Sequence, residues 1–223
     1  MITEKLTQLA WSLYGRFAWD QNRSSDTLDL GQRIVDILSS KKEGESEHVW
    51  DVGCGTGYYS YQLAKAGFSV TGIDYAKGML DVAKANYQGI PNLVFKQMDV
   101  SKILPVKSGT VSHVICVSSI QALPDPLFSL KELNRIMKAG GSLIITHTSS
   151  RRSPQDSHMM GAKSTFLSKG LLSIKSYVEK KGFTTYWTKE ELTSMIQICG
   201  FEIVKVEILS ERMIIIGQKK NSL

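Results

Sequence analysis

An aspartate followed by three closely spaced glycines is the first group of residues in this chain that could bind a small polar ligand. Residues 48–57 read His-Val-Trp-Asp-Val-Gly-Cys-Gly-Thr-Gly. The apolar run that stops at the glycines, and the helical spacing of Tyr59 and Leu63 after them, predict a strand, a tight turn and a helix start. Glycines let a ligand approach the backbone, and the first turn of a helix has free N–H groups that can donate to a carboxylate or phosphate.

The spacing of these glycines separates two classes of ligand. A dinucleotide site requires G-x-G-x-x-G, but here the third glycine comes one residue early and Tyr58 stands where that fingerprint requires Gly or Ala. Asp51 places an anionic acceptor beside the loop, and this charge would repel a pyrophosphate. A donor-rich loop next to a carboxylate suits instead a zwitterion with an ammonium and a carboxylate. A nicotinamide-dependent reductase is therefore disfavoured.

This stretch resembles the first motif of the class I S-adenosylmethionine-dependent methyltransferases, (D/E)-x-G-x-G-x-G, and it matches that motif at every position. The resemblance is to small-molecule members of the methyltransferase-11 or UbiE-like type. It implies S-adenosyl-L-methionine as the cofactor and S-adenosyl-L-homocysteine as the product. The cofactor contacts that it implies in this loop are Asp51, Gly53, Cys54, Gly55 and Gly57.

Two further strands end in acidic residues. Phe68–Asp74 reads as a second strand, and a carboxylate at this separation from the glycines can accept both hydroxyls of a ribose, as in dinucleotide sites. The resemblance implies that Tyr75 and Met79, which follow Asp74, flank the adenine. For Met79 alone, an ordinary core position is the alternative.

Asn92–Gln97 reads as the third strand, closed by Met98-Asp99-Val100. In the resembled family an acid at this place binds the exocyclic amine of adenine, and the next backbone N–H binds a ring nitrogen. Asp99 and Val100 match these positions. The alternative for Asp99 is a turn cap before Ser101.

Val111–Val117 is a near-continuous apolar run, which predicts a central parallel strand covered on both faces. Ser118 follows it and is expected to contact the cofactor, while Gln121 stands where small-molecule members of the family often have a histidine. The Pro-Pro-aromatic motif with which family members grip amide or base nitrogens is absent. Asp125-Pro126 reads instead as a helix N-cap with proline at the first helical position.

His147 ends the fifth predicted strand, Ser142–His147, which follows a Gly-Gly pair. Open α/β sheets bind their ligands at this edge, and a histidine there can take a proton near neutral pH. His147 is therefore the candidate general base and substrate contact. A hydrogen-bond donor to the substrate and a bystander are the alternatives.

The segments around this core contribute the other substrate candidates. Helical spacing predicts N-terminal helices over Leu6–Trp19 and Leu28–Leu38. In the resembled family such helices cover the cofactor, so Tyr14 and Trp19 are candidate substrate contacts, with ordinary helix packing as the alternative. Residues 149–187 break the strand–helix rhythm, as a lid does. Arg151 and Tyr186 are the candidate substrate contacts in this segment.

We therefore expect a Rossmann-like three-layer α/β sandwich with a seven-stranded sheet in the order 3-2-1-4-5-7-6 and an antiparallel strand 7. One domain should span residues 1–223. Its parts are an N-terminal helical cap (1–47), a cofactor-binding core (48–148), a lid insertion (149–187), and a final helix with an antiparallel strand pair (188–223). The helix begins at a capping box formed by Thr188 and Glu191.

Composition bounds the remaining expectations. The 223 residues are 42% apolar, which suffices for one buried core, and there is neither a leader nor an apolar run of about 18 residues. Three scattered cysteines indicate a reducing compartment and no metal site, so a cytoplasmic protein without a membrane partner is expected. The sequence leaves the oligomeric state open.

The net charge of the chain is +6, but where the basic residues lie says more about possible partners than the total does. Lys and Arg are concentrated in residues 149–189, where they form a solvated surface, attract an anionic small molecule, or bind nucleic acid. We expect methyl transfer to an oxygen, nitrogen or sulfur atom of a small molecule, with no metal and no nucleic acid. An RNA methyltransferase that uses the basic segment and a non-catalytic cofactor-binding protein are the alternatives.

Overall fold

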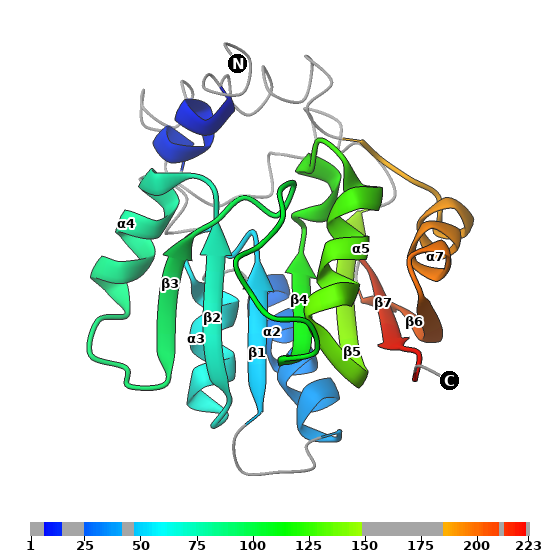
Figure 1. Cartoon of the computed structure of the whole chain (residues 1–223). Coiled ribbons are helices and arrows are strands. Elements are labelled where there is room, and N and C mark those ends of the chain that lie inside the picture. The colour runs from blue at the N-terminus through cyan, green and yellow to red at the C-terminus, as the bar shows by residue number, and fades with distance from the viewer. Residues whose placement is uncertain (1–6, 15–24, 42–46, 149–184, 210–211, 222–223) are drawn as a thin grey trace.

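The computed structural model describes residues 7–14, 25–41, 47–148, 185–209 and 212–221. The strands form one seven-stranded sheet in the order β3-β2-β1-β4-β5-β7-β6 (Figure 1). Neighbours from β3 to β5 pair in parallel, whereas β7 is antiparallel to β5 and β6. The predicted strand order and the antiparallel seventh strand are confirmed.

The elements have the following bounds. The strands are β1 (His48–Val52), β2 (Ser69–Asp74), β3 (Leu93–Gln97), β4 (Val111–Val117), β5 (Met137–Thr148), β6 (Phe201–Leu209) and β7 (Arg212–Lys219). The helices are α2 (Ser25–Ser39), α3 (Tyr58–Lys65), α4 (Lys77–Asn86), the short 3-10 helix η2 (Ile120–Ala122), α5 (Pro126–Ile136) and α7 (Lys189–Ile198). Residues 7–14 form a further helix.

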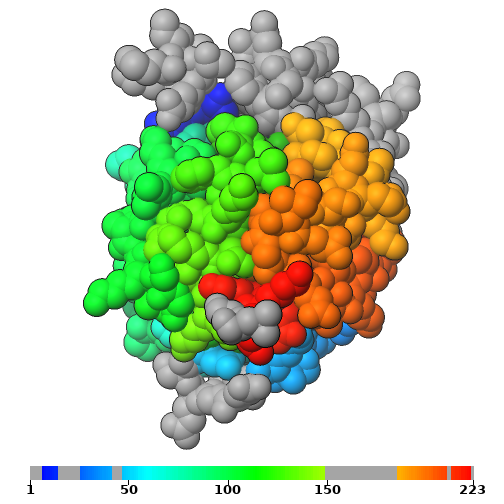
Figure 2. All heavy atoms as spheres, turned by 45° about the vertical axis from the view of Figure 1, so that its right-hand side comes forward, coloured from blue at the N-terminus to red at the C-terminus, as the bar shows by residue number. Residues whose placement is uncertain are grey.

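Two hydrophobic clusters cover the two faces of the sheet. One joins α2, α3 and α4 to it, and the other joins α5 and α7. Figure 1 shows α5 in front of the sheet with α2 and α3 behind it, and Figure 2 shows α7 against α5 on the surface. All seven residues of β4 are buried, as the apolar run predicted, because β4 lies between β1 and β5 under both helical layers.

Local capping fixes where two helices begin. Asp125 accepts a hydrogen bond from the Phe128 N–H (2.9 Å) and precedes a proline in the first turn of α5. Thr188 and Glu191 form the predicted capping box at α7, with bonds of 3.2 and 2.8 Å. Each cap satisfies N–H groups that the helix itself leaves unpaired.

The fifth strand begins earlier than predicted. β5 starts at Met137, directly after α5, and its register against β4 shifts between Val111 and His113. A Cβ on Gly141 would lie 2.4 Å from the Ser112 carbonyl oxygen, so only glycine lets the two strands come together here. The Gly140–Gly141 pair therefore forms an irregularity within the strand, whereas the sequence analysis had placed this pair before a strand that begins at Ser142.

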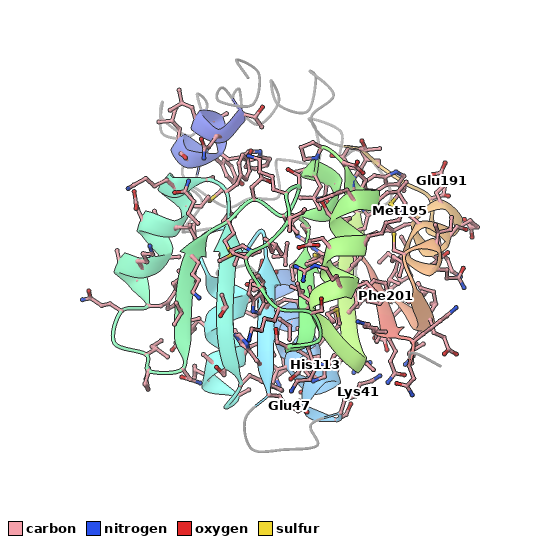
Figure 3. The ribbon with its side chains drawn as sticks, viewed as in Figure 1. Lys41, Glu47, His113, Glu191, Met195 and Phe201 are labelled. Carbon is pink, nitrogen blue, oxygen red and sulfur yellow. The ribbon has the colours of Figure 1, made fainter. Side chains whose placement is uncertain are left out.

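A buried histidine pairs with a glutamate at the amino-terminal edge of the sheet. His113 Nε2 lies 2.8 Å from Glu47 Oε2, and its Nδ1 accepts a bond from the Ser142 N–H (3.1 Å). Figure 3 shows both side chains at the end of the sheet opposite the helix of residues 7–14. These contacts close that edge with the chain's own groups and leave the opposite, carboxyl-terminal edge for ligands.

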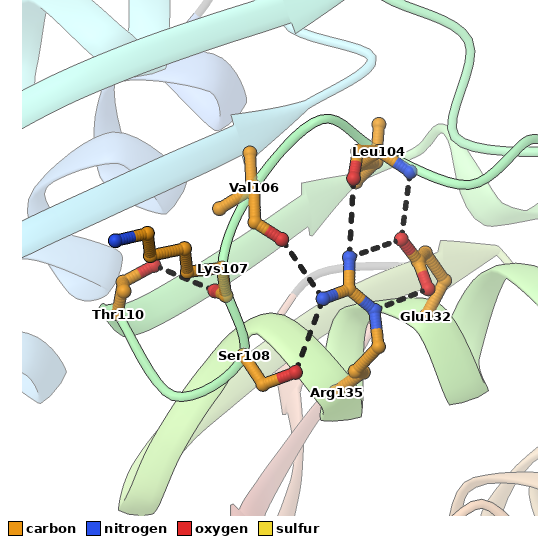
Figure 4. Close-up of polar contacts among 7 residues, drawn as sticks. All are labelled: Leu104, Val106, Lys107, Ser108, Thr110, Glu132 and Arg135. Carbon is orange, nitrogen blue, oxygen red and sulfur yellow. Dashed lines mark hydrogen bonds and ion pairs between the residues drawn. The ribbon is translucent and has the colours of Figure 1, made fainter.

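A glutamate–arginine pair holds the long connection from β3 to β4, in which residues 98–110 form no helix. Glu132 of α5 accepts bonds from the Leu104 N–H (2.7 Å) and from Arg135. Arg135 in turn donates to the carbonyls of Leu104 and Val106 and to the Ser108 hydroxyl (Figure 4). The Arg135 hydrogen bonds lower the pKa of Glu132, which keeps it ionised.

We expect Glu132→Ala to lower the free energy of unfolding by about 2 to 3 kcal/mol, because the Leu104 N–H and the Arg135 guanidinium lose their charged partner. Urea denaturation followed by circular dichroism measures this loss. Asp81→Ala is the matched control, since Asp81 forms an exposed ion pair with Lys77, and such pairs contribute about 0 to 1 kcal/mol. Equal losses in the two variants would contradict a specific role for Glu132.

Candidate functional site at the carboxyl edge of the sheet

The glycine loop after β1 is fixed by contacts within the chain. Gly53, Gly55 and Gly57 have φ angles of 69°, 54° and 84°. A Cβ on Gly53 would lie 2.4 Å from the Ser119 Cβ, so a larger residue would separate the loop from the end of β4. Ser119 also donates to the Val52 carbonyl (2.7 Å). The loop is thereby locked to the neighbouring strand.

Most N–H groups of this loop are already used. Those of Gly53 and Cys54 donate to the Ile73 carbonyl, at 2.8 and 3.0 Å, and that of Gly57 donates to Cys54. The Cys54 side chain is buried in the cluster under α2 and α3. A ligand would therefore find few free N–H donors in the loop and would contact the first turn of α3 instead. It could reach the main chain of Cys54 but not its side chain.

Gly55 is the loop position with the fewest near neighbours among the described residues. Of the atoms in these residues, a Cβ placed there would meet only the Met79 sulfur, at 3.9 Å. Met79 is buried on the first turn of α4. The structure thus brings together two residues that the sequence assigned to the cofactor from separate motifs.

Asp51 is a buried carboxylate near the end of β1. It is 1% exposed and accepts a hydrogen bond from the Ser60 hydroxyl (2.6 Å). Burial, and to a smaller extent the nearby Asp74, raise its pKa to about 7, although the bonds from Ser60 act to lower it. Within the part of the chain that the structure describes, Asp51 forms no ion pair.

Asp74 is a second buried carboxylate, at the end of the adjacent strand β2. It accepts from the Gly55 N–H (2.9 Å) and the Ala76 N–H (2.8 Å). Burial raises its pKa to about 6 in spite of these bonds. A carboxylate has about four acceptor positions, so Asp74 can still accept from a ligand. Two acids of raised pKa on neighbouring strand ends mark this edge as a candidate functional site.

The end of β3 supports both interpretations of Asp99. Its carboxylate accepts from the Ser101 N–H (3.0 Å) and hydroxyl (2.5 Å), and Lys102 lies 3.1 Å away. Burial opposes ionisation, but these partners hold the pKa of Asp99 below its usual value. The turn cap is thus present, and the half-buried side chain keeps acceptor capacity. Val100 is buried in the cluster under α5 and α7.

The helix of residues 7–14 docks on the turn between β2 and α4. Gln8 donates to the Tyr75 carbonyl (2.6 Å), and the Gly78 N–H donates to the Ser12 hydroxyl (3.2 Å). In Figure 1 this helix lies beyond the ends of β2 and β3. Tyr14 makes an edge-to-face contact with Trp11, with ring centroids 5.8 Å apart.

On the other side of the loop, β4 ends at a residue with an unusual backbone. Ser118 has a φ of 51°, the only positive value of a non-glycine residue in the described chain. Its N–H donates to Thr146, and its hydroxyl accepts from Arg212 (2.5 Å). A strained residue of this kind at a strand end is typical of a functional site. The sequence had assigned Ser118 to the cofactor but had missed Arg212.

Thr185–Trp187 crosses the ends of β4 and β5 and covers two predicted substrate residues. The Thr185 N–H donates to the Gln121 carbonyl (2.8 Å), and the Trp187 N–H donates to His147 Nε2 (3.1 Å). The rings of Tyr186 and Trp187 lie 6.1 and 5.6 Å from the imidazole. We call Thr185–Trp187 the strap.

His147 lies in a setting different from the one expected. The sequence placed it at an accessible mouth, but it is 1% exposed and its Nε2 is occupied by Trp187. Burial lowers the pKa of the imidazole. Among the described residues neither His147 Nδ1 nor Gln121 Oε1 has a hydrogen-bond partner, so both keep polar capacity beneath the strap.

Several predicted features lie outside the described residues. They are Trp19, Arg151 and residues 149–184 of the expected lid, with most of the basic segment. The described residues contain no group of His, Cys, Asp and Glu that could hold a metal ion. None of their helices has the length and apolarity needed to cross a membrane.

Comparison with known proteins agrees with this arrangement. Residues 50–145 match the family model described as a methyltransferase domain. The demethylmenaquinone methyltransferase of Staphylococcus aureus (strain JH9) is 32% identical over 165 residues, which cover 70% of this chain and 68% of that protein. The same figures hold for the protein of strain Newman.

Solved structures share the fold at low sequence identity. One is a chain from the Haloferax volcanii complex of the Trm112 methyltransferase activator with a methyltransferase: its TM-score is 0.71 at 18% identity, over 95% of this chain and 97% of that one. An S-adenosylmethionine-dependent methyltransferase from Aquifex aeolicus gives a TM-score of 0.63 at 20% identity, over 89% and 95%. With the motif loop, the buried acids and these relatives together, the chain belongs to the class I S-adenosylmethionine-dependent methyltransferases, and S-adenosylmethionine is its cofactor.

Proposed function

We propose that this methyltransferase acts on a small molecule, at an oxygen, nitrogen or sulfur atom. The observation that carries the proposal is the strap, whose main-chain bonds to Gln121 and His147 enclose the edge of the sheet beside the strained Ser118. An enclosed edge suits a small acceptor better than a duplex or a folded protein. The name of the Staphylococcus aureus relatives, demethylmenaquinone methyltransferase, supports the same class of acceptor.

The residues present fit the cofactor. Asp51 would accept from its ammonium, Asp74 from its ribose hydroxyls, and Gly55 with Met79 would border it, since the described residues leave room beside Gly55. Tyr75, Asp99, Val100 and Ser118 remain proposed contacts. Bound S-adenosylmethionine supplies a methyl group on a sulfonium, which is an excellent leaving group. The protein's own contribution is then in-line positioning, which supplies up to ~7 to 11 kcal/mol in favourable cases, and exclusion of water.

Transfer of a labelled methyl group tests the proposal. The protein is incubated with methyl-labelled cofactor and an extract of its source cells that has been divided into a small-molecule ultrafiltrate, RNA and protein. We expect label in the ultrafiltrate, with matching formation of S-adenosylhomocysteine. Reduced demethylmenaquinone is the first defined acceptor to test. Because one structural neighbour is named a carbon methyltransferase, the product analysis must also cover methylated carbon.

Label in RNA would favour the RNA methyltransferase alternative. Binding of cofactor with no transfer to any fraction would favour a non-catalytic protein. Asp51→Asn serves as the site control in the same assay, since it should reduce any transfer that depends on this cofactor site.

Cofactor affinity should fall as the pH falls, because the ammonium-binding form of Asp51 is the ionised one. Protonation of a group with a pKa of about 7 should weaken binding of S-adenosylhomocysteine about tenfold between pH 8 and pH 6. Calorimetric titration at several pH values measures this change. Asp51→Asn should bind at least about tenfold more weakly at pH 8 and lose most of the pH dependence. A wild-type affinity that is constant over this range would contradict the role of Asp51.

The same substitution should stabilise the protein without cofactor. Because the folded state raises the pKa of Asp51, ionisation of this group costs folding free energy as the pH rises from about 4 to about 7. Asp51→Asn removes this cost, so its free energy of unfolding should exceed that of the wild type by about 1 to 4 kcal/mol above pH 7 and match it near pH 4. Urea denaturation at pH 8 and near pH 4 measures this difference in stability. A variant that is less stable than the wild type at pH 8 would contradict the prediction.

His147 should act as a positioning residue rather than a general base, because its Nε2 accepts from Trp187 and its ring is buried. We expect His147→Gln, which can still accept from Trp187, to lower kcat less than about fivefold and to leave the pH–rate profile in place. Loss of a general base would lower kcat by ~10² or more and remove the acidic limb. The labelled-transfer assay over a pH series distinguishes these outcomes.

A further inference from the structure

Arg212 places a cation at the ligand-binding edge of the sheet. Because β7 runs antiparallel to β5, its first residue pairs with Thr148, the last residue of β5. The half-buried side chain then reaches back to the end of β4, where it donates to the Ser118 hydroxyl. The guanidinium is thus fixed beside the strained residue that ends β4.

This guanidinium is unlike the two other arginines in the described chain. Arg33 forms an ion pair with Glu207, and Arg135 forms one with Glu132. No described carboxylate forms an ion pair with Arg212, which donates to the Ser118 hydroxyl instead. A guanidinium has five N–H donors in a planar fork that matches a carboxylate. Arg212 therefore keeps donors and a positive charge for a ligand.

Tyr59 connects this cation to the cofactor side. Its hydroxyl bonds to Thr27, and burial raises its pKa to about 12, with Arg212 acting against the rise and Asp51 adding to it. Tyr59 thus lies within the electrostatic reach of both charged groups. Along the edge of the sheet the order is β1 with Asp51, β4 with Ser118, then β5 and β7 with Arg212. Strands are about 4.8 Å apart, so about 14 Å separates the line of β1 from that of β7. The registers also place Arg212 four residues closer to the ligand-binding edge than Ile216, the β7 residue level with Asp51.

We propose that Arg212 is the anion-binding residue of the acceptor site and that the methyl acceptor carries a carboxylate or an ionised hydroxyl. This inference rests on the proposed function and narrows its substrate class. A fixed guanidinium would orient such a group across the edge from Asp51. A nearby positive charge also favours the ionised form of a hydroxyl, so an acceptor bound in this form would need no protein base to remove its proton. The buried, occupied imidazole of His147 agrees with that requirement.

A pair of probes that differ only in charge tests the inference without turnover. The protein loaded with S-adenosylhomocysteine is titrated by calorimetry with 2-naphthoate and with its neutral counterpart 2-naphthamide. We expect the wild type to bind naphthoate at least tenfold more tightly than naphthamide. Arg212→Gln should reduce naphthoate affinity to that for naphthamide, and Arg212→Lys should retain part of the preference.

Lys220→Gln is the matched control, because it removes an exposed cation just beyond the opposite end of β7 and should leave both affinities unchanged. Thermal unfolding of each variant confirms that it is folded. If Arg212→Gln weakens S-adenosylhomocysteine binding tenfold, Arg212 holds the cofactor and the inference is refuted. It is also refuted if the wild type shows no preference for naphthoate, or if the preference survives Arg212→Gln. Since no methyl group is transferred, these results are independent of the labelled-extract assay.

Discussion

The burial of two carboxylates at adjoining strand ends is the constraint on which the rest of the structure depends. Asp51 and Asp74 are almost inaccessible, and each has a pKa raised by burial. Because the same carboxylates ionise near pH 4 in the unfolded chain, folding becomes less favourable as the pH rises from about 4 to about 6 to 7. Without a cation, the protein near neutral pH therefore holds groups that oppose its own folding. In the proposed binding mode, the ammonium group of the cofactor would offset this cost by pairing with Asp51.

Such a site works only if the surrounding chain cannot relax and let water in. The tight approach of Gly53 to Ser119 locks the loop to β4, and the loop N–H groups are tied to Ile73. The helix of residues 7–14 adds a further contact on the turn that carries Tyr75. These contacts oppose an outward movement of the two carboxylates into water. In this region, the contacts that hold the backbone in place also keep the two carboxylates buried.

Local chemistry made most of the fold predictable from the sequence. The apolar run of β4, the cap at Asp125 and the capping box at Thr188 each follow from neighbouring residues, and the motif glycines with the strand-end acids predicted the cofactor side. The start of β5 was missed because Gly141 acts through its close approach to another strand. The hydrogen bond from Trp187 to His147 and the position of Arg212 also could not be predicted from neighbouring residues in the sequence. Arg212 lies 94 residues from Ser118 in the chain, and only the antiparallel register of β7 brings them together.

The charges along the carboxyl-terminal edge of the sheet would place the two reactants of the proposed reaction on different sides of the site. Asp51 and Asp74 make the β1–β2 side attractive to a cation, whereas Arg212 makes the β4–β7 side attractive to an anion. A cationic cofactor and an anionic acceptor would then be drawn to opposite sides of Ser118. Exchanging the two ligands would place like charges together. The strap lies over the proposed acceptor side, where exclusion of water would strengthen both interactions because the local dielectric falls. Positioning by opposed charges explains how such a site can favour methyl transfer while its histidine stays buried and bonded to the strap.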